Sequence, residues 1–343
     1  MLHLLASAAL AQEAPPIVNG STTQDYEPVG AILQIYNNQG GAFCSGTLVA
    51  TKYVITAAHC VTAAKDAQSQ GWDIWFMVGH DVYKDAGWID YAEVKNLWYH
   101  SGYSDSSSDI NDDIGVLELK TKITSVPTMP VNSTSPKNSW SGDPVTFVGF
   151  GITDDGEDDG GKKRTVDVPF YTYDPSFIYT YSGDSGTIYN ICSGDSGGAA
   201  LMELGGEMKL VGANSFGFNI NGGQPDCNRR GAAAGATRID AYWSWITTYI
   251  PESELNTGGG DADTDSDSDS DTDSDSDADS DTDSDADTDW TPDTGLLGDT
   301  GNEPARPRGG TGGAGLCSTG TPAGSAAFGL LALAGLALAR RRR

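Results

Sequence analysis

The sequence predicts an all-β fold from Ile17 to about Pro251. There, short runs rich in valine, isoleucine and aromatic residues are separated by clusters of glycine, asparagine, aspartate and serine, which indicates a barrel or sandwich. These runs are GAILQIYNN, YVITAAHC, DIWFMVG, DIGVLELK, DPVTFVGFG and MKLVGANSF. One helix is expected, over 238–250, because apolar residues share one face there. They are Ile239, Tyr242, Trp243, Ile246 and Ile250.

The two ends of the chain predict export and a membrane-proximal tail. Residues 1–11 form a short apolar run that ends in Ala9-Leu10-Ala11, a small-x-small sequence typical of signal-peptidase sites. An apolar N-terminal strand is the alternative, since no lysine or arginine precedes the run. Near the other end, 323–339 is a 17-residue apolar run followed by four arginines. This length is at the lower limit for crossing a bilayer, and the arginines would stay cytoplasmic.

An acidic tract lies between these parts. The net charge is −28, and 15 of the 48 acidic residues are the aspartates at every odd position from 261 to 289. This composition excludes nucleic acid as a partner, because no basic face can neutralise phosphates. We expect 256–310 to be a disordered linker whose tract reaches roughly 100 Å. A calcium-binding repeat is the alternative, but strict two-residue alternation lacks the glycine turns that cage calcium.

Five cysteines lie at positions 44, 60, 192, 227 and 317, and none has the C-x-x-C spacing of a zinc or redox site. In an exported chain the first four can form two disulfides. Cys44 and Cys60 would close a loop of about 17 residues, worth roughly 3 kcal/mol. Cys317 is then the odd one and needs a separate role.

The five letters SGDSG occur twice, ending at Gly186 and at Gly197, so either copy could carry a nucleophilic serine. A serine hydroxyl needs a base, a group that orients the base, and donors for the oxyanion. Among four histidines, His59 follows an apolar run and precedes a cysteine. Asp112 and Asp113, at the start of an expected strand, could orient it.

Eight motifs together resemble the chymotrypsin/trypsin family of serine proteases, in that family's order. They are IVNG, CSGTLV, TAAHC, NDDIGVLEL, VGFG, CSGDSGG, SFG and ATRI with the helix after it. The resemblance implies two six-stranded antiparallel β-barrels and a C-terminal helix in a protease domain over 17–255. We expect a monomeric serine endopeptidase acting on proteins or peptides, with no cofactor or metal. His80 and His100 lie in segments that resemble surface turns of the family, so they are expected to be structural.

The resemblance distinguishes the two SGDSG copies. The second copy follows Cys192, which the family pairs with a later cysteine, here Cys227. Ser196 is therefore the nucleophile candidate. Ser185, in the first copy, is expected in a polar loop near the mouth of the substrate pocket.

The resemblance also implies the remaining catalytic roles. His59 would take the proton of Ser196, and Asp113 would hold the His59 tautomer. The backbone N–H groups of Gly194 and Ser196 would form the oxyanion hole. Asp112 stands where the family usually has asparagine, and strand alternation is expected to point it away from His59.

Activation by proteolysis is implied as well. In the family, the buried aspartate before the nucleophile, here Asp195, pairs with a newly released α-amino group, here that of Ile17. Residues 12–16 would be the propeptide. Because Pro15 and Pro16 precede the cut, we expect an activating peptidase that is not trypsin-like, or N-terminal trimming.

The substrate pocket is expected around Asn190, Ser215, Phe216 and Gly217. Asn190 lies six residues before Ser196, at the pocket floor of the family. A trypsin-like enzyme has aspartate there, and asparagine lacks that charge, so neutral P1 side chains are predicted. Gly217 is expected to keep the pocket entrance open.

The segment 311–343 resembles C-terminal sorting signals of Gram-negative surface proteins, in a cysteine-bearing form like that of myxobacteria. Such a tail is cut near its cysteine, here Cys317, by a sorting peptidase, and Cys317 would carry the anchor. A permanent membrane span is the alternative. The rival to an enzyme is a catalytically silent adhesive protein on the cell surface, which loss of a triad residue would favour; all three are present.

Overall fold

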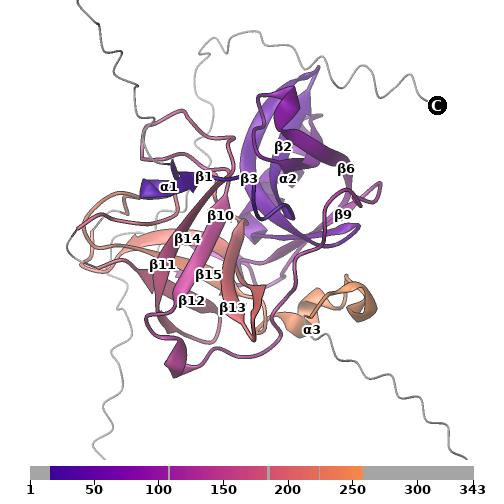
Figure 1. Ribbon diagram of the computed structural model, residues 1–343. Helices are drawn as coiled ribbons and strands as arrows, with labels where there is room; N and C mark the ends of the chain where they lie inside the picture. Colours follow the sequence, from indigo (N-terminus) through magenta and orange to yellow (C-terminus); the bar gives the residue numbers. More distant parts are fainter. Residues whose placement is uncertain (1–15, 107–108, 184–185, 224, 258–343) are drawn as a thin grey trace, which may run out of the picture. The chain divides into compact units, whose positions relative to one another are not determined.

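The computed structural model describes residues 16–106, 109–183, 186–223 and 225–257, drawn as ribbons in Figure 1. The predicted signal peptide (1–11), acidic tract and C-terminal segment (311–343) lie outside the described residues, as does Ser185. Two closed six-stranded antiparallel β-barrels make up most of the described part, as predicted. No helix among the described residues is both long and apolar enough to cross a membrane.

The first barrel closes in the order β2-β3-β4-β9-β6-β5 (Figure 1). Its strands are β2 (Val29–Tyr36), β3 (Gln39–Ala50), β4 (Tyr53–Thr56), β5 (Asp73–Gly79), β6 (Trp88–Tyr99) and β9 (Gly115–Leu119). Valine, isoleucine, leucine and phenylalanine side chains fill its interior, with Phe76 and Leu117 fully buried. The register places Thr56, the last residue of β4, opposite Gly115 of β9, so the ends of these strands lie together.

The second barrel closes through pairing of β11 with β12, in the order β11-β10-β13-β14-β15-β12. Its strands are β10 (Pro144–Gly149), β11 (Arg164–Tyr173), β12 (Phe177–Tyr181), β13 (Ala199–Leu204), β14 (Glu207–Asn219) and β15 (Ala232–Arg238). The short strand β1 (Ser21–Thr22) adds to β11, with Thr22 opposite Arg164. The core of the second barrel contains the buried side chains of Phe147, Phe170 and Ile178.

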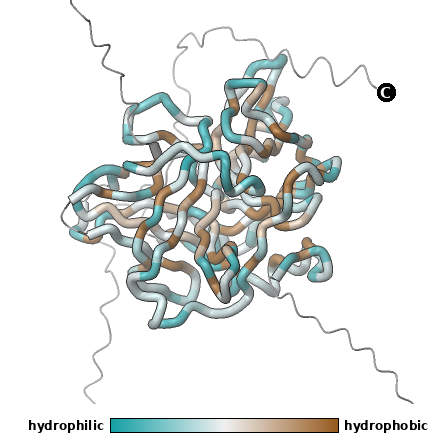
Figure 2. The backbone as a smooth tube through the Cα atoms, in the orientation of Figure 1, coloured by the Kyte–Doolittle hydropathy of each residue, from teal (hydrophilic) through white to brown (hydrophobic). Residues whose placement is uncertain are grey.

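A third apolar cluster joins the two barrels. It combines side chains of the first barrel, such as Ile55 and Val116, with those of the second, such as Val148 and Leu201. In Figure 2 the hydrophobic stretches follow the strands and the hydrophilic ones gather in the surrounding loops. Backbone hydrogen bonding also crosses here, because the N–H of Ser45 in β3 donates to the carbonyl of Ser196 at 2.8 Å.

The remaining elements are short, apart from one helix of 12 residues. They are α1 (Pro16–Asn19), α2 (Ala58–Ser69), α3 (Trp243–Ile246), the hairpin β7 (Ser104–Ser106) and β8 (Asp109–Asn111), and the 3₁₀ turns at Asp85–Gly87, Asn138–Trp140 and Glu252–Glu254. In α1, Ile17 and Val18 have non-helical dihedral angles, so this segment is a turn that enters the second barrel.

The predicted C-terminal helix over 238–250 is wrong in its extent. Arg238 ends β15, and regular α-helix is confined to α3. After α3 the hydrogen bonding is mixed, because the N–H groups of Thr248 and Tyr249 donate to carbonyls three residues back and that of Ile250 donates to the Ile246 carbonyl four residues back. The apolar face is nevertheless used, because Ile239, Ile246 and Ile250 are fully buried in the cluster between the barrels.

Candidate active site

His59 lies in the first turn of α2, directly after β4 ends at Thr56. The sequence prediction did not include this helix. An available signal was the alanine-rich run at 57–67, since alanine has the highest helix propensity and Val61, Ala64 and Ala67 recur at helical spacing. The turn from strand to helix buries His59, leaving it 9% exposed.

Asp113 is fully buried and faces His59. Its Oδ2 lies 2.9 Å from His59 Nδ1, and its Oδ1 accepts a hydrogen bond from the His59 backbone N–H at 2.9 Å. The carboxylate thus holds both the ring and the backbone of the histidine. The hydroxyl of Thr237, a residue that the sequence prediction missed, donates to the Asp113 carbonyl at 2.8 Å.

Asp113 is held as a carboxylate. Burial acts to raise its pKa, but the charge and hydrogen bonds of His59 and the hydroxyl of Ser215 outweigh burial and lower the pKa below its usual value. Ser215 Oγ donates to Asp113 Oδ2 at 2.5 Å. Ser215, expected in the substrate pocket, therefore turns its hydroxyl toward the His59–Asp113 pair.

Asp112 and Asp113 do not lie in a strand, so the predicted reason for their opposite directions is wrong. They precede β9, and Asp112 has a left-handed backbone with φ of 50°, which aspartate tolerates. Asp112 Oδ1 accepts a hydrogen bond from Tyr242 Oη at 2.6 Å, and its Oδ2 lies 3.3 Å from His100 Nδ1.

Ser196 lies in a tight loop that approaches the end of β4. The loop needs glycine on both sides, with φ of 94° at Gly194 and 75° at Gly197, and a Cβ at Gly197 would lie 1.9 Å from Thr56 Oγ1. Ser196 is 2% exposed, and its Oγ has no hydrogen-bond partner within the described ranges. Its carbonyl oxygen lies 3.5 Å from Cys60 Sγ, which brings this loop next to the residue after His59.

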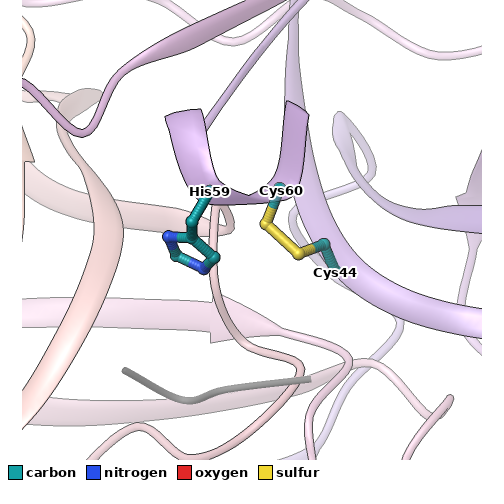
Figure 3. Close-up of side chains that lie close together, drawn as sticks. All are labelled: Cys44, His59 and Cys60. Carbon is teal, nitrogen blue, oxygen red and sulfur yellow. A yellow bond between two sulfur atoms is a disulfide. The ribbon is translucent and has the colours of Figure 1, made fainter. Parts of the chain in front are cut away.

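Both predicted disulfides are present, Cys44–Cys60 and Cys192–Cys227. Figure 3 shows the His59 imidazole beside the first of them. This grouping of one histidine and two cysteines does not make a metal site, because disulfide sulfurs are not thiolates and thiolates are the metal ligands.

Asp195, the residue before Ser196 in the same loop, is fully buried. Its Oδ1 accepts the N–H of Gly151 at 2.8 Å, and its Oδ2 accepts the N–H of Cys192 at 2.9 Å. Burial nevertheless raises its pKa to about 6. A carboxylate in this position calls for a positive charge nearby. Ile17, the predicted partner, is itself fully buried in the core of the second barrel.

Of the predicted pocket residues, Asn190 precedes the loop of Ser196, whereas Ser215, Phe216 and Gly217 lie in β14. Asn190 is 1% exposed, neither atom of its amide has a hydrogen-bond partner among the described residues, and its backbone forms a bridge with Val18. Phe216 packs edge-on against Phe177 with ring centroids 5.1 Å apart. At Gly217, a Cβ would lie 3.8 Å from the Ala233 carbonyl oxygen, an ordinary van der Waals contact, so the structure has room for a small side chain there.

The other two histidines contact neither Asp113 nor Ser196 in the described structure. The His100 ring lies against the rings of Tyr242 and Trp245, with centroids 5.4 and 5.6 Å away. His80 lines a polar pocket together with Thr22 and Lys84.

Ser45 is a residue of the site that the sequence prediction missed. Its hydroxyl donates to the Gly194 carbonyl at 2.8 Å and accepts the N–H of Phe150 at 2.9 Å. A side chain of the first barrel thereby joins two loops of the second. The only signal in the sequence was its place directly after Cys44.

Two antiparallel six-stranded barrels, with a histidine, an aspartate and a serine where they meet, have the architecture of trypsin-like serine proteases. Residues 17–246 match the sequence profile of the trypsin family, and the chain belongs to that family.

Relatives from animals and bacteria agree with this assignment. Vitamin K-dependent protein C of Mus musculus is 28% identical over 262 residues, covering 71% of this chain and 53% of that protein. Trypsin of Saccharopolyspora erythraea is 28% identical over 222 residues, covering 62% and 88% respectively. Chymotrypsin-like elastase family member 1 of Rattus norvegicus is 23% identical over 287 residues, covering 73% and 99%. The chain spans about half the length of the protein C relatives.

Proposed function

We propose that this protein is a serine endopeptidase that hydrolyses peptide bonds through Ser196, His59 and Asp113. The observation that carries the proposal is the buried Asp113 carboxylate 2.9 Å from His59 Nδ1. Because the N–H at Nδ1 donates to the Asp113 carboxylate, Nε2 is the basic nitrogen of the ring, as in the serine-protease triad. The loop of Ser196 packs against Cys60, the next residue along α2.

In the proposed mechanism, Ser196 Oγ attacks the substrate carbonyl carbon while His59 Nε2 takes the hydroxyl proton. The carbonyl oxygen gains negative charge and accepts hydrogen bonds from the N–H groups of Gly194 and Ser196, each worth about 3 kcal/mol in the transition state. His59 then gives its proton to the leaving amine. Water, activated by the same imidazole, hydrolyses the acyl-enzyme.

A labelling experiment tests this proposal. The chain beginning at Ile17 is treated with a fluorophosphonate, and the modified residue is mapped by mass spectrometry. Modification of Ser196, absent in Ser196→Ala, is expected. Absence of labelling, or modification of Ser185 instead, would contradict the triad and favour the adhesive alternative.

We also propose that the enzyme is made as a zymogen, with residues 12–16 as propeptide and cleavage before Ile17. The new α-ammonium would compensate the buried Asp195 carboxylate, whose pKa burial raises to about 6. N-terminal sequencing of active enzyme is expected to give Ile17, and any other first residue would contradict the proposal.

Substrate preference is proposed to be for neutral P1 side chains. Asn190 is a buried amide that can both donate and accept a hydrogen bond but carries no charge to pair with lysine or arginine. Profiling with a peptide library tests this. Dominant cleavage after arginine or lysine would contradict it.

The place of action is proposed to be the outside of the cell. This rests on the sequence features at the two ends of the chain: the signal-like residues 1–11, the acidic linker 256–310 and the tail 311–343 with Cys317. Cell fractionation followed by mass spectrometry of the C-terminal peptide is expected to find the protease at the surface with its tail cut near Cys317. An intact tail would favour a permanent span.

A further inference from the structure

Arg164, the first residue of β11, is an arginine in the interior of the protein, with 2% of its surface exposed. Its Nη1 donates to the carbonyl of Gly151 at 2.5 Å, and its Nη2 donates to the carbonyl and the carboxylate of Asp159 at 2.7 and 3.2 Å. Burying a guanidinium is costly unless its donors are satisfied and its charge is compensated. An arginine kept in such a place therefore calls for a role.

Gly151 connects Arg164 to Asp195. The carbonyl of Gly151 accepts the hydrogen bond from Arg164, while its N–H donates to Asp195 Oδ1 at 2.8 Å. A Cβ on Gly151 would lie 2.6 Å from Asp195 Cγ, so the backbone of Gly151 is pressed directly onto the carboxylate. Burial raises the pKa of Asp195, and the positive charge of Arg164 acts in the opposite direction, whereas the Asp159 carboxylate that pairs with Arg164 acts to raise the pKa.

The residues on either side of Gly151, Phe150 and Ile152, are connected by hydrogen bonds to the loop 193–196, which carries the proposed oxyanion donors. The N–H of Ile152 donates to the carbonyl of Ser193 at 2.8 Å. Ser45 links the N–H of Phe150 to the carbonyl of Gly194. A shift of Gly151 would therefore be transmitted to residues 193–195, where the backbone must keep its left-handed turn.

We propose that Arg164 is a positioning residue for this loop, and that it acts chiefly in the chain that still carries residues before Ile17. In that form the described residues give the two oxygens of the Asp195 carboxylate the neutral backbone N–H groups of Gly151 and Cys192, and Arg164 adds positive charge through Gly151. The uncut chain then keeps a formed oxyanion loop and a basal reactivity. After cleavage, the Ile17 ammonium makes Arg164 largely dispensable. The inference rests on the proposed function, because it concerns the same loop.

The test compares two forms of the protein, the full chain and the chain trimmed to begin at Ile17, each verified by intact mass. The rate constant for fluorophosphonate labelling of Ser196 is measured in both. Arg164→Met is expected to slow labelling of the full chain by about a hundredfold, because it removes the hydrogen bond that holds the Gly151 carbonyl and with it the support of the loop that carries the proposed oxyanion donors. In the trimmed chain we expect a change of about threefold or less, because the ammonium compensates Asp195 there.

Two further variants separate charge from packing. Arg164→Lys keeps the positive charge and is expected to restore most of the labelling rate in the full chain. Lys163→Met is the matched control, because Lys163 is also a buried cation, 1% exposed, but donates to the carbonyls of Asp25 and Tyr26 instead. We expect it to leave the ratio between the two forms unchanged.

The possible results distinguish the inference from the proposed function. Equal loss in both forms, or a lysine variant no better than the methionine one, would mean that Arg164 is merely structural and would overturn the inference. An unmodified full chain that does not label, beside a trimmed chain that does, would overturn the inference alone. Failure of the unmodified trimmed chain to label at Ser196 would overturn the proposed function and the inference with it.

Discussion

In the first barrel, His59 and Asp113 lie at the ends of regular elements, at the start of α2 and just before β9. In the second barrel, Ser196 lies in a loop with left-handed glycines on both sides. Asp113 is satisfied by His59 and Ser215, which lower its pKa, whereas Asp195 is buried with a raised pKa. One half of the site is complete within the fold, and the other contains a carboxylate that needs a further positive charge.

This contrast indicates where control over activity belongs. A group whose charge is fully compensated is a poor site of regulation, because a charge that binds nearby changes its free energy little. A buried carboxylate with a raised pKa couples strongly to any cation that reaches it. The second barrel is therefore the half that activation can act on.

The largest effect is expected from removing the proposed nucleophile, Ser196, in the second barrel. Ser196→Ala should lower kcat for a peptide substrate by about a millionfold, as loss of the serine does in other serine proteases. Steady-state hydrolysis is the measurement. Ser185→Ala, in the other copy of SGDSG, is the control and should leave kcat unchanged; a comparable loss there would assign the nucleophile wrongly.

A substitution in the part of the site that the first barrel contributes should lower kcat less. Asp113→Asn keeps the shape but lets His59 adopt the wrong tautomer, and the triad template gives a loss of about 10⁴-fold in kcat. The variant should remain folded, because the amide still has Ser215 and the His59 backbone as neighbours. A loss below tenfold would show that Asp113 does not orient the base.

The two disulfides allow a comparison of stability. Replacing Cys192 and Cys227 by serine should lower the free energy of unfolding by about 4 kcal/mol, and replacing Cys44 and Cys60 by about 3 kcal/mol, because the first pair closes the longer loop. The sequence separations are 35 and 16 residues. Urea unfolding of both double variants measures the difference, and a reversed order would contradict it.

The raised pKa of Asp195 predicts a pH dependence of stability in the full chain. Between the unfolded pKa, 3.8, and the folded value of about 6, the folded state binds more protons than the unfolded state. Asp195 therefore lowers the free energy of unfolding as pH rises through this window, by about 3 kcal/mol. Denaturant unfolding from pH 3 to 7 should show this fall when the chain is compared with Asp195→Asn. An identical pH profile in the two proteins would contradict the prediction.

The smallest effect is expected at Asp112. Asp112→Asn keeps a residue that tolerates the left-handed backbone and can still accept the hydrogen bond from Tyr242. Activity should stay within about twofold, since the neighbouring Asp113 carries the contact with His59. Side-by-side kinetics of Asp112→Asn and Asp113→Asn measure this, and a large loss in the former would place Asp112 in the site.

Strand spacing predicted a barrel or sandwich and the positions of the cysteines suggested the Cys44–Cys60 pair, whereas the two six-stranded barrels and the Cys192–Cys227 pair were implied by the resemblance to the protease family. The sequence prediction missed α2, whose weak apolar pattern is dominated by alanine, and it extended the last helix into β15. The second error arises where tertiary contacts override local preference, because Arg238 pairs with β14 and donates to the Asp174 carbonyl.

Residues that support the site from a distance were also out of reach. Ser45, Thr237 and Arg164 act on groups 149, 124 and 13 positions away in the chain, at Gly194, Asp113 and Gly151 respectively. Apart from the place of Ser45 directly after Cys44, nothing in their immediate sequence marks these contacts. Only closure of the barrels brings the partners together.

The backbone bridge between Val18 and Asn190 has a consequence of its own. One pair of residues joins the segment that follows Ile17 to the proposed floor of the substrate pocket. Coupling of this kind is reciprocal, so a substrate side chain that orders Asn190 would tighten the grip on the N-terminal segment by the same factor as that segment favours the substrate. In such an arrangement, bound substrate would help to keep the N-terminal segment in its place.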